Sequence, residues 1–119
     1  MSKIQKFEDL ICWQKARLMV KDIYTLTSAG IFKRDFALKE QIRRAAISVV
    51  LNIAEGFARK SHKEFIQFLF ISHGSVAEVQ AALYLALDLN YVPQEKFQKL
   101  FNDCTEISRI ISGLIKSLR

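Results

Sequence analysis

Residues 41–59, QIRRAAISVVLNIAEGFAR, constrain the fold more than any other segment of this chain. Apolar residues recur there at intervals of three and four, which is the spacing of one side of an α-helix. Polar residues recur at the same intervals and form one continuous stripe along that helix. They are Gln41, Arg44, Ser48, Asn52, Glu55 and Arg59. The segment is therefore predicted to be a long helix with one buried and one polar face.

Residues that interrupt helices are rare in the whole chain, with one proline and four glycines among 119 residues. That scarcity favours long helices over sheet. Helical spacing and capping residues predict four helices, near residues 8–26, 35–59, 61–89 and 93–118. Short connections make neighbouring helices antiparallel. We therefore expect one all-α domain over residues 1–119, an antiparallel up-down-up-down four-helix bundle.

Several residues indicate how these helices begin and pack. Asp35 and Ser61 are the predicted N-caps of the second and third helices, and Ser61 forms a capping-box pattern with Glu64. Trp13 occupies the centre of the inward stripe of the first helix, so we expect it to be substantially buried. Gly74 in the third helix predicts a close helix crossing or a slight bend. A heptad seam is predicted along the fourth helix, at Phe97, Leu100, Cys104, Ile107, Ile111, Leu114 and Leu118.

Charge is distributed unevenly along the chain, whose net charge is +6. Residues 33–63 hold eight Lys or Arg against three acids, whereas residues 64–95 hold four acids and no Lys or Arg. The two segments can pair within or between subunits, or the basic one can face phosphates. The strongest basic cluster falls at the corner between the second and third helices. Its residues are Arg59, Lys60 and Lys63 beside His62, and Arg43 is a further candidate for phosphate contact.

The polar stripe supports two interpretations. Arg43 and Arg44 point about 100° apart on a helix, so only Arg44 joins the stripe, where Glu55 or Glu78 can pair with it. The simpler interpretation is a buried polar network that fixes helix register. The alternative is a polar site at a subunit interface or pore. The candidate network comprises Gln41, Arg44, Ser48, Asn52, Glu55 and Glu78.

No catalytic residue, metal site or cofactor is expected. Di-iron bundles use Glu-x-x-His, but Phe70 precedes His73 by three residues and Arg59 precedes His62. Cys12 and Cys104 each lie in an apolar helical pattern and are predicted to be core residues. The first residues, MSKIQKFEDL, lack the apolar region of a secretory signal, and uninterrupted apolar runs are short. We therefore expect a cytoplasmic protein without a membrane partner.

Three segments together resemble a known family of small bacterial proteins. They are FEDLICWQKA (7–16), QIRRAAISVVLNIAEGFAR (41–59) and EFIQFLFISHGSVAEV (64–79). They resemble the four-helix-bundle proteins also called the 23S rRNA intervening-sequence protein, or S23 ribosomal protein, family. The resemblance implies an all-helical bundle in a ring-like homopentamer with no established catalytic residues. The family usually has a proline at the position of Val50, so the resemblance leaves a kink in the second helix in doubt.

Two functional hypotheses follow. The first is a non-enzymatic, oligomeric binding or scaffold module, with RNA or DNA as its leading ligand. An accessory protein of diversity-generating retroelements with a similar barrel binds nucleic acid, but that kinship is an analogy of fold. The second hypothesis is a purely structural or protein-interaction module. Half of the residues are apolar, more than one bundle core covers, so we expect a homo-oligomer; the number five comes from the resemblance.

Overall fold

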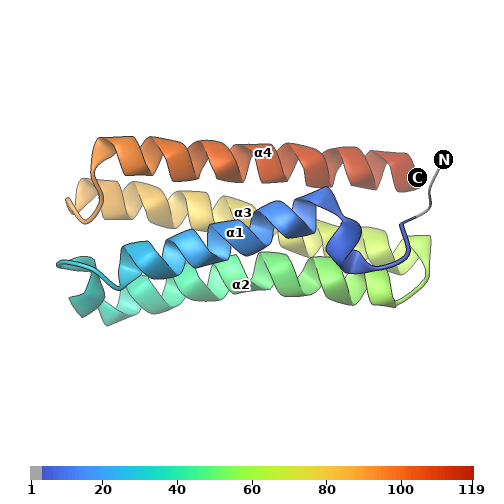
Figure 1. Cartoon of the computed structure of the whole chain (residues 1–119), viewed down its shortest axis with the longest axis horizontal. Helices are drawn as coiled ribbons and strands as arrows, with labels where there is room; N and C mark the ends of the chain where they lie inside the picture. The colour runs from blue at the N-terminus through green and yellow to red at the C-terminus, as the bar shows by residue number, and fades with distance from the viewer. Residues whose placement is uncertain (1–3) are drawn as a thin grey trace.

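The computed structural model describes residues 4–119 and contains four long helices (Figure 1). They are α1 (Ile11–Thr27), α2 (Phe36–Ala58), α3 (His62–Asp88) and α4 (Gln94–Leu118). Two short 3-10 turns, η1 (Phe7–Asp9) and η2 (Phe32–Arg34), precede α1 and α2. The predicted bounds of α2, α3 and α4 are confirmed to within one residue, and the described chain contains no strand.

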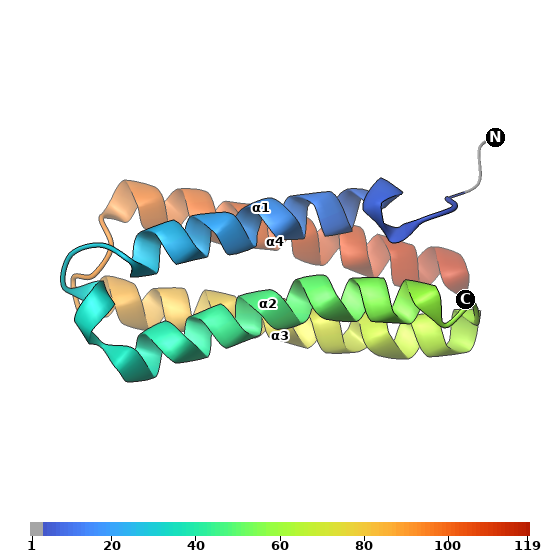
Figure 2. The ribbon, with the colours of Figure 1, turned by 60° about the horizontal axis from the view of Figure 1, so that its bottom comes forward.

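The four helices pack as a square bundle, because each packs against its neighbour in sequence and α1 also packs against α4. Consecutive helices run in opposite directions, as Figures 1 and 2 show. The molecule extends over 46 × 23 × 19 Å along its principal axes. The α2–α3 connection and the C-terminal end of α4 lie at one end of the long axis. The other two connections between long helices lie at the opposite end. The predicted antiparallel up-down bundle is confirmed.

The first helix begins three residues later than predicted. Leu10 is extended, at φ −75° and ψ 126°, and its buried side chain separates η1 from α1. The side-chain amide of Gln14 donates to the carbonyl oxygen of Glu8 at 2.8 Å, which holds η1 against the helix. The buried stripe of α1 includes Cys12 and Met19, so Trp13 lies at its edge and is only half-buried. The prediction for Trp13 is thus confirmed only in part.

The seam of α4 supplies one side of the core. Its first five predicted positions, from Phe97 to Ile111, are buried. Beyond them the buried position is Ile115, whereas the predicted Leu114 and Leu118 are half-buried. A straight helix drifts about 20° per heptad relative to a strict seven-residue repeat, which accounts for the change of face.

Side-chain caps begin α2 and α3 at the predicted residues. The Asp35 carboxylate accepts from the Leu38 amide at 3.1 Å and from the Tyr91 hydroxyl at 2.9 Å. Asp35 therefore also ties the start of α2 to the α3–α4 connection. The Ser61 hydroxyl accepts from the Glu64 amide at 3.3 Å. The carboxylate of Glu64 turns toward the basic corner instead of back to Ser61, so half of the predicted capping box forms.

The close helix crossing predicted at Gly74 is wrong. Gly74 is exposed, and a Cβ built there would have no atom within 4 Å. The close approach lies at Gly56, where a Cβ would stand 2.6 Å from Cβ of Phe68 and 3.0 Å from the Phe65 ring. Gly56 thus lets the end of α2 lie against the start of α3. Helix α2 continues without interruption through Val50, where the family usually has proline.

Helix α3 is long and apolar enough to cross a membrane, judged by length and composition alone. Its inner face, which includes Leu69, Val76 and Leu83, is fully buried against the rest of the bundle. A core helix of a soluble bundle meets the same two criteria.

Candidate functional site

The basic cluster predicted at the α2–α3 corner lies at one end of the bundle, on a tight turn (Figure 1). Lys60 has φ +57°, the left-handed conformation that residues other than glycine rarely adopt. This conformation reverses the chain within the three residues that separate α2 from α3. The side chains of Lys60, His62 and Lys63 are exposed, and none forms an ion pair within residues 4–119. The corner thus presents two uncompensated lysines.

Arg59 belongs to the same corner but is held by neighbouring side chains. Its guanidinium lies 3.0 Å from the Glu55 carboxylate and 3.5 Å from the Glu64 carboxylate. It also stands over the Phe68 ring, 4.9 Å from the centroid. The two acids compensate much of its charge, so Arg59 is less available to a phosphate than Lys60 or Lys63.

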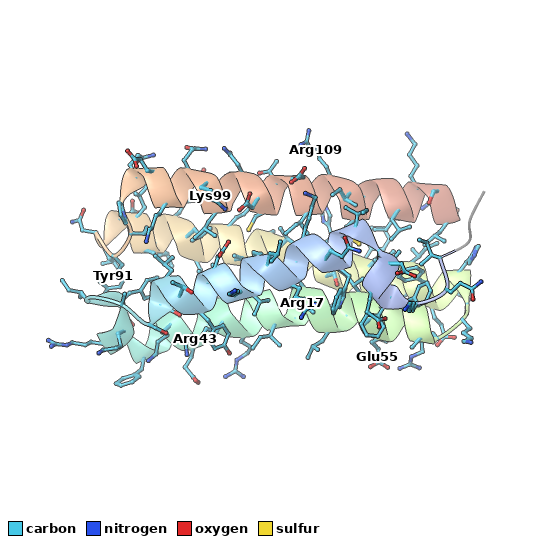
Figure 3. All side chains as sticks on the ribbon, in the orientation of Figure 1. Arg17, Arg43, Glu55, Tyr91, Lys99 and Arg109 are labelled. Carbon is cyan, nitrogen blue, oxygen red and sulfur yellow. The ribbon has the colours of Figure 1, made fainter. Side chains whose placement is uncertain are left out.

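The structure does not bring Arg43 to this corner. Arg43 precedes Arg59 by 16 residues on one helix, which corresponds to about 24 Å along the axis. Figure 3 shows Arg43 and Glu55 in opposite halves of α2. The Arg43 guanidinium donates to the hydroxyls of Thr27, at 2.8 Å, and Ser28, at 3.0 Å. It also lies 4.1 Å from the centroid of the Tyr24 ring. Arg43 therefore fastens α2 to the end of α1.

The polar stripe of α2 forms separate contacts instead of one buried network. The Gln41 amide donates to the Glu78 carboxylate at 2.7 Å, and both side chains are exposed. About two turns further along α2, the hydroxyls of Ser48 and Ser75 lie 2.9 Å apart. The Asn52 amide donates to the carbonyl and the hydroxyl of Ser48 at 2.9 and 3.0 Å. Ser48 and Asn52 are half-buried, whereas Gln41 and Glu78 are exposed.

The three charged members of the stripe, Arg44, Glu55 and Arg59, form local ion pairs. Arg44 lies 3.7 Å from Glu40, one turn earlier on the same helix, and both side chains are largely exposed. The predicted pairing of Arg44 with Glu55 or Glu78 is wrong, because those acids bind Arg59 and Gln41. An exposed pair on one helix surface contributes little to stability, so the buried-network interpretation fails for these residues.

Two serines of α3 complete the α2–α3 contact and were not among the predicted polar residues. The buried Ser72 hydroxyl donates to the Val49 carbonyl oxygen at 2.9 Å. Ser75 is also buried and meets Ser48, as described above. Serine in a long apolar helix, at the spacing of its buried face, is the signal that identifies such contacts.

The described residues contain no group of three or more His, Cys, Asp or Glu side chains that could hold a metal ion. Burial raises the pKa of the Cys12 thiol to about 11 and that of the Cys104 thiol to about 12. Both thiols are therefore protonated at neutral pH and are poor nucleophiles. His73 shares a hydrogen bond of 2.9 Å with the Ser108 hydroxyl, which joins α3 to α4.

An apolar pocket of about 500 Å³ opens beside the basic corner. Most of its lining is apolar and comes from residues before and after η1, both helices of the corner and the end of α4. These residues are Ile4, Leu10, Phe57, Phe65, Leu114 and Leu118. Lys60, Ser61 and His62 line the pocket as well, so the corner and the pocket share residues.

Comparison with known proteins gives the same family by sequence and by structure. A family model described as 23S rRNA-intervening sequence protein matches residues 8–113. The crystal structure of a protein of unknown function from the S23 ribosomal protein family of Bacteroides thetaiotaomicron superposes with a TM-score of 0.82. It shares 26% sequence identity, and the match covers 89% of this chain and 99% of that one. A search of curated proteins found no match. Because the family model spans most of the sequence, the chain belongs to the 23S rRNA-intervening sequence protein family.

Proposed function

We propose that this protein is a non-enzymatic, homo-oligomeric scaffold that binds RNA or DNA through its α2–α3 corner. The observation that carries the proposal is the exposed pair Lys60 and Lys63, which no carboxylate compensates within the described residues. Lysine contacts to backbone phosphates carry no sequence information. Binding is therefore weak, salt-dependent and indifferent to sequence. Arg59 contributes less because two acids hold it.

Assembly would strengthen such a weak site. A closed ring repeats the corner once per subunit, and simultaneous contacts with one strand raise the apparent affinity without any new contact in the subunit. The homopentamer is our proposal for the assembled form, and its count of five comes from the family resemblance. The physical support from this chain is apolar surface left exposed on α1, α2 and α3.

The same exposed surface supports a second function, a structural or protein-interaction module without nucleic acid. Leu18 and Leu51 are both more than 60% exposed, although each is a large apolar side chain. If a protein partner covers these two leucines, the basic corner needs no role in the function. The two functions differ in their response to salt, because phosphate binding weakens steeply as salt rises and apolar contact does not.

A fluorescence anisotropy titration with a labelled 15-nucleotide single strand at low salt tests the proposed function. Lys60→Glu with Lys63→Glu should abolish binding, and binding by the unaltered protein should fall as salt is raised. The matched control is Lys96→Glu with Arg109→Glu, at two exposed positions of α4. Figure 3 labels Arg109. Each double variant exchanges two positive for two negative charges, so both lower the net charge from +6 to +2.

The control separates local contact from overall charge. If both variants lose binding equally, the α2–α3 corner is not the site. If the unaltered protein does not bind at low salt, the nucleic-acid function fails and the protein-interaction function stands.

A further inference from the structure

We propose that the pocket beside the basic corner receives an unstacked base, so that the ligand is single-stranded or locally unpaired nucleic acid. The inference rests on the proposed function and names its substrate class. In a regular duplex the bases are paired and stacked, and exposing one costs unstacking energy. A single strand offers its bases without that cost.

The first support is the size and lining of the pocket. Its volume of about 500 Å³ lies in the range of small-molecule sites. Two aromatic rings line it, Phe57 from the end of α2 and Phe65 from the start of α3. Their centroids are 5.7 Å apart and their planes meet at 82°, so the two rings touch edge to face and form one aromatic wall of the pocket. Aromatic walls accept any base, since every base has an apolar face.

The second support is the uneven polarity of the pocket. Three of its four polar side chains, Lys60, Ser61 and His62, are consecutive residues at the corner, and the fourth is Gln5 before η1. The other lining residues are apolar. No carboxylate lines the pocket in the described structure. A nucleotide has the matching division, with an apolar base at one end and an anionic phosphate at the other. With the base against the apolar lining, its phosphate would lie at the corner that carries the uncompensated lysines.

The test compares two 15-nucleotide strands of equal length and charge, oligo-dT and an abasic strand of tetrahydrofuran units. Both present phosphates to the corner, but only oligo-dT presents bases. We expect oligo-dT to bind at least about fivefold more tightly, a low value for one stacked base. Phe57→Leu should reduce that ratio toward one and leave the affinity for the abasic strand unchanged, because the lysines remain.

The matched control is Phe36→Leu, at a phenylalanine that is 70% exposed at the opposite end of α2. It should keep the full ratio. Binding of the abasic strand by Phe57→Leu also reports that the variant is folded. Equal affinity of the unaltered protein for the two strands overturns the pocket inference and leaves the phosphate-binding function standing. If the unaltered protein binds neither strand, the proposed nucleic-acid function itself is wrong.

Discussion

At the scale of single residues, Trp13 combines strong packing with an unmet polar group. Its ring meets Phe7 edge-on at 5.0 Å, and the Arg17 guanidinium lies 5.6 Å from its centroid. Its Nε1 is buried without a hydrogen-bond partner in the described structure. Trp13→Ala should therefore cost about 3 kcal/mol of unfolding free energy, and Trp13→Phe less than about 1.5 kcal/mol, because it keeps an aromatic ring and removes the unpaired N–H. Urea unfolding at fixed protein concentration measures both, and an unaltered midpoint for Trp13→Ala would contradict the packing role.

The residues of the candidate site differed in how far the sequence could place them. Lys60 and Lys63 were predictable because they flank a local signal, the cap at Ser61, which fixes the turn and therefore their exposure. Arg43 was not predictable. Its hydroxyl partners lie 15 and 16 residues away, beyond a connection whose path the sequence does not specify. Helical periodicity predicts the direction in which a side chain points, but it does not predict which residue of another helix that side chain contacts.

At the scale of helices, the two glycines Gly56 and Gly113 have opposite roles. A Cβ at Gly56 would collide with Phe68 on α3, whereas one at Gly113 would meet no atom within 4 Å. Gly56→Ala should destabilise the protein by about 1–3 kcal/mol, because α2 and α3 must separate. Gly113→Ala should stabilise it by up to about 1 kcal/mol, the difference in helix propensity. Thermal melts at equal protein concentration distinguish them, and equal shifts in both would show that the α2–α3 approach is not tight.

Helix boundaries and helix contacts also differed in predictability. The starts of α2 and α3 follow from Asp35 and Ser61, whose side chains cap the next turn. The start of α1 depends on Leu10, which is buried in an extended conformation by the rest of the bundle. The choice of Gly56 over Gly74 as the close crossing likewise depends on the distance between two helices. The local sequence predicts the helix caps, whereas tertiary packing determines the start of α1 and which glycine lies at the close helix crossing.

At the scale of the whole molecule, two different apolar faces remain exposed. One lies along α1 and α2, on one side of the bundle (Figure 2), where the exposed Leu51 lines a shallow pocket together with Val20 and Val50. The other lies on α3, where Gly74, Ala77 and Ala81 separate two pairs of large side chains. These pairs are Phe70 with Ile71 and Tyr84 with Leu85, all about half exposed. Small residues between large ones allow a neighbouring helix to approach closely. Contact between two unlike faces produces a ring when the rotation closes, whereas a two-fold dimer joins one face to itself.

Light scattering at micromolar concentration should therefore give a mass well above the 13.7 kDa of one chain, and five chains of that mass give about 68.5 kDa. A mass of 13.7 kDa would refute assembly, while a stable dimer or tetramer would refute only the count of five. Leu51→Glu damages the α1–α2 face and Leu85→Glu damages the α3 face, so each variant alone should be a folded monomer with unchanged helical circular dichroism. Ile31→Glu, an exposed apolar residue in the connection between α1 and α2, is the matched control and should still assemble.

Mixing the two monomeric variants decides between the ring and a symmetric dimer. In a ring the intact α3 face of Leu51→Glu meets the intact α1–α2 face of Leu85→Glu, and one interface forms. The mixture should then contain a species of two chains, about 27.4 kDa from two masses of 13.7 kDa. If the chain used one face against itself, one of the two variants would assemble alone, and mixing it with the other would add nothing. Complementation between two damaged but unlike faces is thus the specific signature of a head-to-tail assembly.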